Sequence, residues 1–352
     1  MEAKQILEKY RKLVWPVVKK YLRTPTFPGA YVIPKKYQAD LDYFWKIVRD
    51  YPERQGKYLR PALVLLTAQA MGVKPKKALK IAAGMQLSED WLLIHDDFED
   101  NSLARRGQPA LHRIYGNELA VNAGDALQVI MWKIFFDSYQ DLGWTKTKLI
   151  LDEFYTQLSR TTVGQMTEIN WTQKNKTDFN DQDWFFIADG KTAYYTIACP
   201  MRLGTIVAGA NHKQLEKLAE FGIYLGRCFQ LVDDLLDLTS DFAGLKKQQG
   251  NDLYEGKKTV MLGHLLRTAK ATDKKKLLAI LAKSRDQKSA SEVAWILSKM
   301  RAYGSLEYGR KLAETYKNKA ETFFEKELGF LSAEPARSEL KSLINFILER
   351  NY

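Results

Sequence analysis

Two aspartate-rich clusters, far apart in the chain, are the residues with the clearest capacity for chemistry. Both have the pattern D-D-x-x-D, the first from Asp96 to Asp100 and the second from Asp233 to Asp237. On a helix, the first and last aspartates of each cluster lie one turn apart on the same face. Each cluster follows an apolar run, and carboxylates on an otherwise buried face are costly unless something neutralises them. Two such faces across a cavity would bind Mg²⁺, whose other ligands are usually water and phosphate oxygens, so the pattern predicts a diphosphate substrate.

Basic residues accompany the clusters in two nearby motifs. Arg105 and Arg106 follow the end of the first cluster by five and six positions. They are either its salt-bridge partners or bidentate ligands of diphosphate oxygens. Lys57 and Arg60 precede Pro61, a residue that suits the first position of a helix. Both cations would then lie near a helix N-terminus, where anions are favoured.

Two further basic motifs come later in the chain. A lysine and hydroxyl pair, Lys191-Thr192, follows Gly190, and a glycine- and lysine-rich segment that we expect to be a loop covers residues 244–258. Each motif alone is explained at least as well by a solvated surface. In combination with two aspartate clusters, they favour a site for a polyanion.

Helical periodicity dominates the pattern of apolar residues, and no sustained alternation of period two indicates a sheet. Of the 352 residues, 45% are hydrophobic, enough for a large core. We expect one all-α domain over residues 1–352, a large helical bundle with a central active-site cavity. Pro16 should disturb the first helix and Pro200 should kink a later one. The helices are expected at about 5–21, 37–51, 61–72, 75–101, 115–139, 145–173, 180–206 and 213–240, with more between 257 and 352.

The net charge of +12 indicates mostly solvated lysine faces, with part of the excess steering polyanionic substrates. The basic residues are dispersed and form no binding motif, so no nucleic-acid partner is expected. The two cysteines, Cys199 and Cys228, form no C-x-x-C motif and fit a reducing compartment. A polar N-terminus and the lack of a long apolar run predict neither a secretory signal nor a transmembrane segment, and thus a cytoplasmic protein.

The order and spacing of these motifs resemble those of the trans-type isoprenyl diphosphate synthases, the polyprenyl synthetase family. The run HDDFEDNSLARRGQPALH resembles the first aspartate-rich region of that family, FQLVDDLLDL the second, and GNDLYEGKKT the lysine loop after it. The resemblance extends from about Gln55 to Thr259. It implies an isoprenoid synthase fold, a homodimer and a Mg²⁺-dependent reaction. In the reaction that the resemblance implies, an allylic diphosphate would ionise, the double bond of isopentenyl diphosphate would attack the carbocation, and the released diphosphate would accept the proton.

The resemblance also implies a role for each motif residue. Six aspartates would bind several Mg²⁺ ions, or Mn²⁺, and with Lys191 would form the catalytic set: Asp96, Asp97, Asp100, Asp233, Asp234 and Asp237. A second set would hold the allylic diphosphate: Arg105, Lys191, Thr192, Gln230, Lys247 and Lys257. A third set would hold isopentenyl diphosphate: Lys57, Arg60 and Arg106.

Two positions depart from the pattern of the family. Tyr58 stands where the family has arginine in Gly-Gly-Lys-Arg-Leu-Arg-Pro. Glu89, seven positions before Asp96, stands where the family usually has the histidine or glutamine that binds isopentenyl diphosphate. A carboxylate repels a diphosphate unless it is protonated or turned toward a cation. Glu89 would therefore pair with Lys57 or Arg60, or it would mark an altered site.

The residues that precede the first cluster bear on the length of the product. Trp91 lies five positions before Asp96, about one and a half helical turns deeper. A large ring there would block the floor of the tunnel, as in the archaeal-type geranylgeranyl diphosphate synthases that this position resembles. Leu92 is not aromatic, unlike its counterpart in many eukaryotic farnesyl enzymes, and Ser88 is the third residue expected to limit length. We expect geranylgeranyl diphosphate, with farnesyl diphosphate second; ordinary core packing is the alternative role for Trp91.

Two other functions compete with that of a short-chain prenyltransferase. Terpene cyclases usually degrade the second aspartate motif and need no isopentenyl site, whereas this chain keeps both, and Glu89 alone favours a cyclase. Non-catalytic partner subunits typically lose aspartates, and this chain retains all six. The sequence therefore predicts an enzyme that condenses isopentenyl diphosphate with dimethylallyl, geranyl or farnesyl diphosphate.

Overall fold

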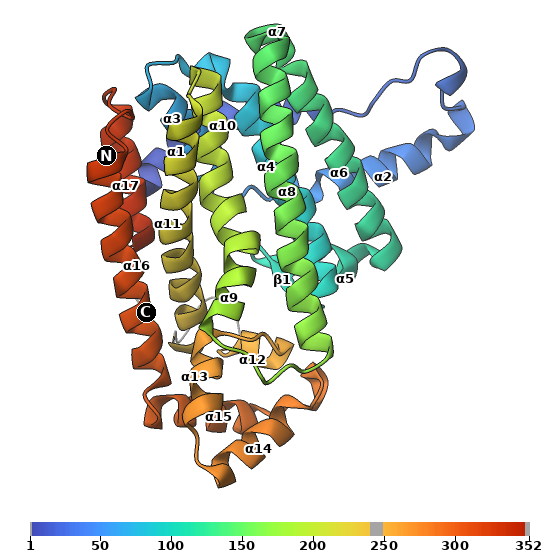
Figure 1. Ribbon diagram of the computed structural model, residues 1–352. Helices are drawn as coiled ribbons and strands as arrows, with labels where there is room; N and C mark the ends of the chain where they lie inside the picture. Colours follow the sequence, from blue (N-terminus) through green and yellow to red (C-terminus); the bar gives the residue numbers. More distant parts are fainter. Residues whose placement is uncertain (1, 240–248, 349–352) are drawn as a thin grey trace. The chain divides into compact units, whose positions relative to one another are not determined.

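The computed structural model describes residues 2–239 and 249–348, which are mostly helical (Figure 1). The strands in these segments are β1 (Ala104–Arg105) and β2 (Gln108–Pro109), which form one short antiparallel hairpin. The all-α fold expected from the sequence is therefore confirmed. Contacts divide the chain into two compact units, so a single domain over residues 1–352 stays a prediction. Unit 1 comprises residues 1–153, 200–211 and 331–342, and unit 2 comprises residues 154–199, 212–330 and 343–352.

Unit 1 is built around α4, the helix that carries the first aspartate cluster. Helix α4 packs on α6, α3 and α1, and buried side chains such as Leu65, Met85 and Leu127 form the core between them. The 3-10 turns η1 (Gly29–Tyr31) and η2 (Lys35–Tyr37) lie between α1 and α2, and η3 (Pro75–Lys77) lies before α4. The α-helices are α1 (Ala3–Tyr21), α2 (Gln38–Glu53), α3 (Leu59–Ala70), α4 (Leu79–Glu99), α5 (Leu111–Tyr115), α6 (Asn117–Asp137) and α7 (Tyr139–Leu142).

Unit 2 is built around α11, the helix that carries the second cluster. Helix α11 packs on the π-helix η4 and on α16, with Phe221, Leu225 and Phe324 buried between them. The elements of this unit are α9 (Asp181–Ala188), η4 (Asp189–Ala198), α11 (His212–Thr239), α12 (Asn251–Glu255), α13 (Val260–Thr268), α14 (Ala271–Leu281), η5 (Arg285–Gln287), α15 (Ala290–Ala302) and α16 (Ser305–Glu327). Three helices have residues in both units: α8 (Trp144–Gln173), α10 (Cys199–Ala208) and α17 (Ala336–Leu348).

Three local expectations from the sequence are wrong. Helix α1 runs through the exposed Pro16, because its buried apolar face offsets the loss of one backbone hydrogen bond. Helix α3 begins at Leu59, so Pro61 is its third residue rather than its first. The segment expected to be a loop contains the short helix α12; Lys247 lies outside the described residues.

The helix before Pro200 is interrupted, as expected, and the interruption is the ten-residue π-helix η4. Proline has no N–H to donate and its ring clashes with the carbonyl four residues earlier, so a regular α-helix does not continue here. Gly226 of α11 allows η4 to approach closely, since a Cβ at this position would lie 2.3 Å from the Cα of Ala193. This close packing fixes the backbone of η4, which carries Lys191 and Thr192.

One helical stretch in the described part of the chain, residues 117–142, is long and apolar enough to cross a membrane. Its α6 portion packs on α4 and α2 and buries Leu127, Met131 and Ile134. Core helices often have this length and composition, so the stretch is weak evidence for a membrane segment.

Candidate active site

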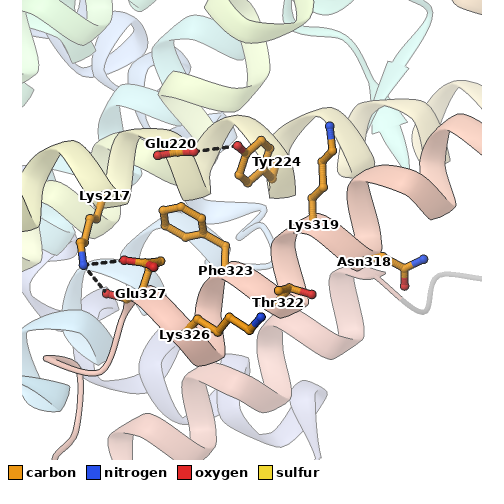
Figure 2. A pocket seen from close by; sticks show the side chains of 9 residues that line it. All are labelled: Lys217, Glu220, Tyr224, Asn318, Lys319, Thr322, Phe323, Lys326 and Glu327. Carbon is orange, nitrogen blue, oxygen red and sulfur yellow. Dashed lines mark hydrogen bonds and ion pairs between the residues drawn. The ribbon is translucent and has the colours of Figure 1, made fainter.

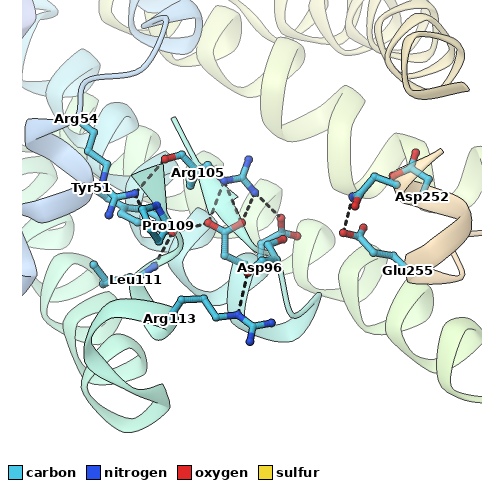
Figure 3. A network of polar contacts seen from close by, with 12 residues as sticks. Tyr51, Arg54, Asp96, Arg105, Pro109, Leu111, Arg113, Asp252 and Glu255 are labelled. Carbon is cyan, nitrogen blue, oxygen red and sulfur yellow. Dashed lines mark hydrogen bonds and ion pairs between the residues drawn. The ribbon is translucent and has the colours of Figure 1, made fainter. Parts of the chain in front are cut away.

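The first aspartate cluster ends α4, and Asp97 is its buried member. The Arg105 Nε atom donates to the two carboxylate oxygens of Asp97 at 3.0 and 2.9 Å, and the Tyr51 hydroxyl donates to Oδ2 at 2.6 Å. Burial and the Asp97 charge raise the pKa of Tyr51, so it stays a donor. Figure 3 shows Tyr51 and Arg105 in this network. Asp97 therefore fastens the β1–β2 hairpin and α2 to the end of α4.

Asp96 and Asp100 are only partly buried and lie one turn apart, as the spacing predicts. The backbone N–H of Asp100 donates to the Asp96 carbonyl at 2.8 Å, and the Arg105 Nη2 atom lies 3.6 Å from the Asp96 carboxylate. Of the two roles open to Arg105, the structure thus places it as a salt-bridge partner of the cluster. Its contact with a diphosphate stays a prediction.

The residues expected to bind isopentenyl diphosphate also lie in unit 1. Lys57 and Arg60 flank the start of α3, where Tyr58 adopts the left-handed conformation with φ of 59°. The Arg60 guanidinium lies 3.1 Å from the carboxylate of Glu89, so Glu89 is turned toward a cation, the first of the two alternatives that the sequence leaves open. Arg106 joins this cluster from the hairpin turn, 3.7 Å from Glu89.

In unit 2, three residues of the sequence motifs form a hydrogen-bonded chain. The Thr192 hydroxyl donates to the Gln230 Oε1 atom at 2.6 Å, and the Gln230 Nε2 atom donates to Asp234 Oδ1 at 2.7 Å. Gln230 and Asp234 are one turn apart on α11, and Thr192 reaches them from η4. The structure therefore brings a predicted metal ligand together with two predicted diphosphate ligands.

Lys191 has a carboxylate partner that the sequence analysis missed. Its Nζ atom lies 2.5 Å from Glu168 Oε2 on α8. A lone glutamate on a long helix carries no signal of its own.

Asp252 is a second residue to which the sequence analysis assigned no role, although it lies within the lysine-loop motif. The backbone N–H of Asp252 donates to the Asp237 carboxylate at 3.1 Å, and the Lys257 ammonium lies 3.7 Å from the carboxylate of Asp252. Lys257 also pairs with Glu255 at 3.0 Å. Figure 3 shows Asp252 and Glu255 at α12. Helix α12 thus adds acidic side chains to the end of α11.

Burial and the crowding of carboxylates raise the pKa of two aspartates in unit 2. Burial raises the pKa of Asp252 to about 7, with neighbouring Asp237 adding to the shift and Lys257 opposing it. Burial also raises the pKa of Asp234 well above its usual range, and Asp252 and Asp233 add to that effect. Such a set of hard oxygen donors fits a divalent cation, which would relieve the repulsion.

The described residues contain no group of three histidine, cysteine, aspartate or glutamate side chains close enough to hold a metal ion. The aspartates would therefore supply only part of a coordination shell. Mg²⁺ suits this arrangement, since it commonly keeps several waters and shares substrate phosphates with one or two carboxylates.

The residues expected to limit product length lie along α4. Trp91 is buried, its Nε1 atom donates to the Met131 sulfur at 3.4 Å, and its ring meets that of His95 edge-on at 5.5 Å. Ser88 is buried and donates to the Met85 carbonyl at 2.7 Å, while Leu92 is half-buried. Trp91 thus fills space between α4 and α6.

An open cavity of about 670 Å³ lies elsewhere in unit 2, between α11 and α16 (Figure 2). Two polar contacts border it: the Tyr224 hydroxyl donates to Glu220 at 2.7 Å, and Lys217 pairs with Glu327 at 2.6 Å. None of the residues singled out by the sequence lines this cavity.

The all-helical fold and two aspartate clusters beside basic side chains define a class of helical enzymes that act on diphosphates with metal ions. The family model described as Polyprenyl synthetase matches residues 42–300. The chain is 32% identical over 300 residues to geranylgeranyl diphosphate synthase of Saccharolobus solfataricus, with 84% of this chain and 86% of that protein covered. It is 31% identical over 297 residues to short chain isoprenyl diphosphate synthase of Methanothermobacter thermautotrophicus, covering 84% and 87%.

Solved structures show the same fold. Geranylgeranyl pyrophosphate synthetase from Pyrococcus horikoshii has a TM-score of 0.83 at 26% identity, with 99% of both chains covered. A geranylgeranyl pyrophosphate synthase from Corynebacterium glutamicum, complexed with isoprenyl diphosphate and magnesium, has a TM-score of 0.84 at 24% identity, with 98% and 99% covered. The chain belongs to the polyprenyl synthetase family. Its function is that of a short-chain trans-prenyl diphosphate synthase, which confirms the predicted prenyltransferase.

Proposed function

We propose that this enzyme extends an allylic diphosphate with isopentenyl diphosphate and releases geranylgeranyl diphosphate. The observation that carries the product length is the buried Trp91 ring on α4, five positions before Asp96. The names of several relatives support the same length. Farnesyl diphosphate is the second candidate, because tryptophan is bulkier than the aromatic side chains usual at this position.

We propose that both aspartate clusters bind magnesium and diphosphate. Bound Mg²⁺ supplies charge neutralisation for the leaving diphosphate. On unit 1, the half-buried Asp96 and Asp100 would provide ligands, whereas Asp97 is occupied by Arg105 and Tyr51 and would hold the helix end in place. On α11, the ligands would be Asp233, Asp234 and Asp237, with Asp252 beside them.

The basic and polar residues would position the allylic diphosphate. Lys191 donates to Glu168 in this structure and would transfer its hydrogen bonds to phosphate oxygens. Thr192 and Gln230 would orient the same group through their link to Asp234. Arg105, Lys247 and Lys257 complete the set in this proposal. No side chain is assigned as the base, because the released diphosphate can take the proton.

Product analysis tests this function directly. Purified protein with Mg²⁺, isopentenyl diphosphate and dimethylallyl, geranyl or farnesyl diphosphate in turn is expected to yield geranylgeranyl diphosphate by mass spectrometry. Product ending at farnesyl diphosphate would select the second candidate. Diphosphate release from the allylic substrate alone would indicate a cyclase, and no turnover would indicate a non-catalytic subunit.

We also propose a homodimer formed by exposed apolar side chains of unit 1. Val129 is 70% exposed, Phe136 50% and Trp144 54%, and the rings of Phe136 and Trp144 lie 5.8 Å apart. Phe136→Asp is expected to shift the protein from dimer to monomer in light scattering, because it places a charge in an apolar interface. The matched control is Leu13→Asp on α1, which is also exposed and should leave the mass unchanged. Equal masses for wild type and Phe136→Asp would contradict this interface.

A cytoplasmic location is part of the proposal. Cys199 and Cys228 are both buried, and a reducing compartment would keep them as thiols. Burial raises the pKa of the Cys228 thiol to about 12, which keeps it protonated and unreactive.

A further inference from the structure

A buried cluster of opposite charges occupies the region of unit 1 expected to bind isopentenyl diphosphate. The Arg106 Nη2 atom lies 2.8 Å from Asp90 and 3.7 Å from Glu89, and the Arg60 Nη1 atom lies 3.1 Å from Glu89. The side chains of Arg60, Glu89 and Arg106 are 19%, 14% and 12% exposed, and that of Asp90 is fully buried. Two adjacent carboxylates of α4 thus neutralise two arginines from α3 and the hairpin turn.

The side chains of the cluster are closely packed, but several of their buried polar atoms make no hydrogen bond. The lack of a side chain at Gly56 makes room for the Arg106 guanidinium, since a Cβ at position 56 would lie 2.8 Å from Nη2. Within the described residues, four buried oxygens in and beside the cluster make no hydrogen bond: Tyr58 Oη, Gln86 Oε1, Glu89 Oε2 and Asp90 Oδ2, of which Glu89 Oε2 has an ion pair with Arg60. Buried polar groups are normally satisfied, and of these four oxygens only the Tyr58 hydroxyl has a proton to donate to an anion.

The pKa of Asp90 reflects both its burial and the charges around it. Burial raises the pKa of Asp90 to about 6, and Glu89 adds to this shift, although Arg106 opposes both effects. Burying the charged form of Asp90 is therefore unfavourable. A buried ion pair of this kind is weak evidence for stabilisation, because desolvation offsets the attraction.

We propose that Glu89 is an internal counter-ion that competes with the diphosphate of the isopentenyl substrate for Arg60 and Arg106, and so sets a weak affinity for that substrate. The proposal rests on the proposed function. Lys57, Arg60 and Arg106 bring three positive charges, and Glu89 and Asp90 remove two of them. A diphosphate must therefore displace Glu89 to gain full contact with Arg60. Glu89 is a specificity-determining residue that acts through the arginines.

Glu89→Gln tests this idea, since it removes one charge and keeps the shape. The Michaelis constant for isopentenyl diphosphate is expected to fall about tenfold, a change typical of losing one buried like-charge interaction. The Michaelis constant for the allylic substrate should change by less than about twofold. The free variant should melt at a lower temperature, because its arginines lose a partner, and isopentenyl diphosphate should raise that temperature more than in wild type.

Matched variants separate this role from a structural one. Glu53→Gln removes an exposed glutamate that pairs with Arg49 on α2 and should change neither constant. Glu89→Asp keeps the charge and should stay near wild type. Should Glu89→Gln fail to fold, Asp90→Asn removes the neighbouring charge and is expected to act in the same direction.

The outcomes are distinct. An unchanged or raised Michaelis constant for isopentenyl diphosphate in Glu89→Gln, with normal turnover, would show that Glu89 positions the arginines and would overturn the proposal. Wild-type protein without any condensation activity would contradict the proposed function instead. In that case, the melting shift with isopentenyl diphosphate alone still compares the affinities of wild type and Glu89→Gln, and an equal shift would overturn the role of Glu89.

Discussion

Alanine at Asp96 or at Asp233 is expected to lower kcat by about a thousandfold, the size of effect seen when a group that stabilises developing charge is removed. Asp96 is half-buried at the end of α4 and Asp233 is exposed on α11, so neither belongs to the core. Their loss should remove metal ligands and leave the helices intact. Steady-state kinetics with Mg²⁺ and circular dichroism of the same samples measure both effects.

Two further variants provide the controls for this experiment. Asp152→Ala removes an exposed aspartate that pairs with Lys148 on α8, and should retain wild-type activity. Asp97→Asn should differ from both, because it removes the charge that pairs with Arg105 and replaces one of the two oxygens that accept from Arg105 and Tyr51 with an NH2 donor, and so lowers the melting temperature as well as activity. Wild-type turnover in Asp96→Ala or Asp233→Ala would rule out the proposed metal sites.

The second large effect concerns product length. Trp91→Ala is expected to shift the main product from geranylgeranyl diphosphate to longer chains, because removing the indole opens space about one and a half turns below Asp96. The variant should also lose stability, of order 3–5 kcal/mol for a buried aromatic ring. Mass spectrometry of reactions with farnesyl and excess isopentenyl diphosphate gives the product distribution.

Loss of stability alone must be separated from a change in the tunnel. Trp45→Ala removes another buried tryptophan of unit 1, which donates to the Leu22 carbonyl from α2, and should lower stability without changing the product. Trp91→Phe keeps a ring and should retain the wild-type product. If Trp91→Ala makes the same products as wild type, Trp91 is ordinary core and the floor lies elsewhere.

Much of the fold could be predicted because helical periodicity is a local property of the sequence. The expected span of residues 145–173 agrees with α8 within one residue, and that of 213–240 agrees with α11 equally well. The π-helix η4 could not be foreseen in detail, since its form depends on packing against Gly226 of α11. Helix α12 was missed because five residues carry too little periodicity to stand out from a glycine- and lysine-rich segment.

In the site, too, the sequence predicts the motif residues but not the partners that reach them from other helices. In the sequence, Asp96 and Asp97 are equivalent members of one motif. In the structure they differ, because the Tyr51 hydroxyl reaches Asp97 from α2. Likewise, Lys191 is visible as part of a motif, whereas its partner Glu168 lies 23 residues away on another helix.

The β1–β2 turn links two groups of charges along α4. Arg106 and Gly107 both have positive φ, 52° and 77°, as a two-residue hairpin turn requires. Arg105 at this turn pairs with Asp97, and its neighbour Arg106 pairs with Asp90, two helical turns earlier. The hairpin therefore contacts α4 at two separate points, through two ion pairs from adjacent arginines. Because both guanidinium groups are attached to one two-residue turn, the turn fixes the spacing between the cations expected to serve the two substrates.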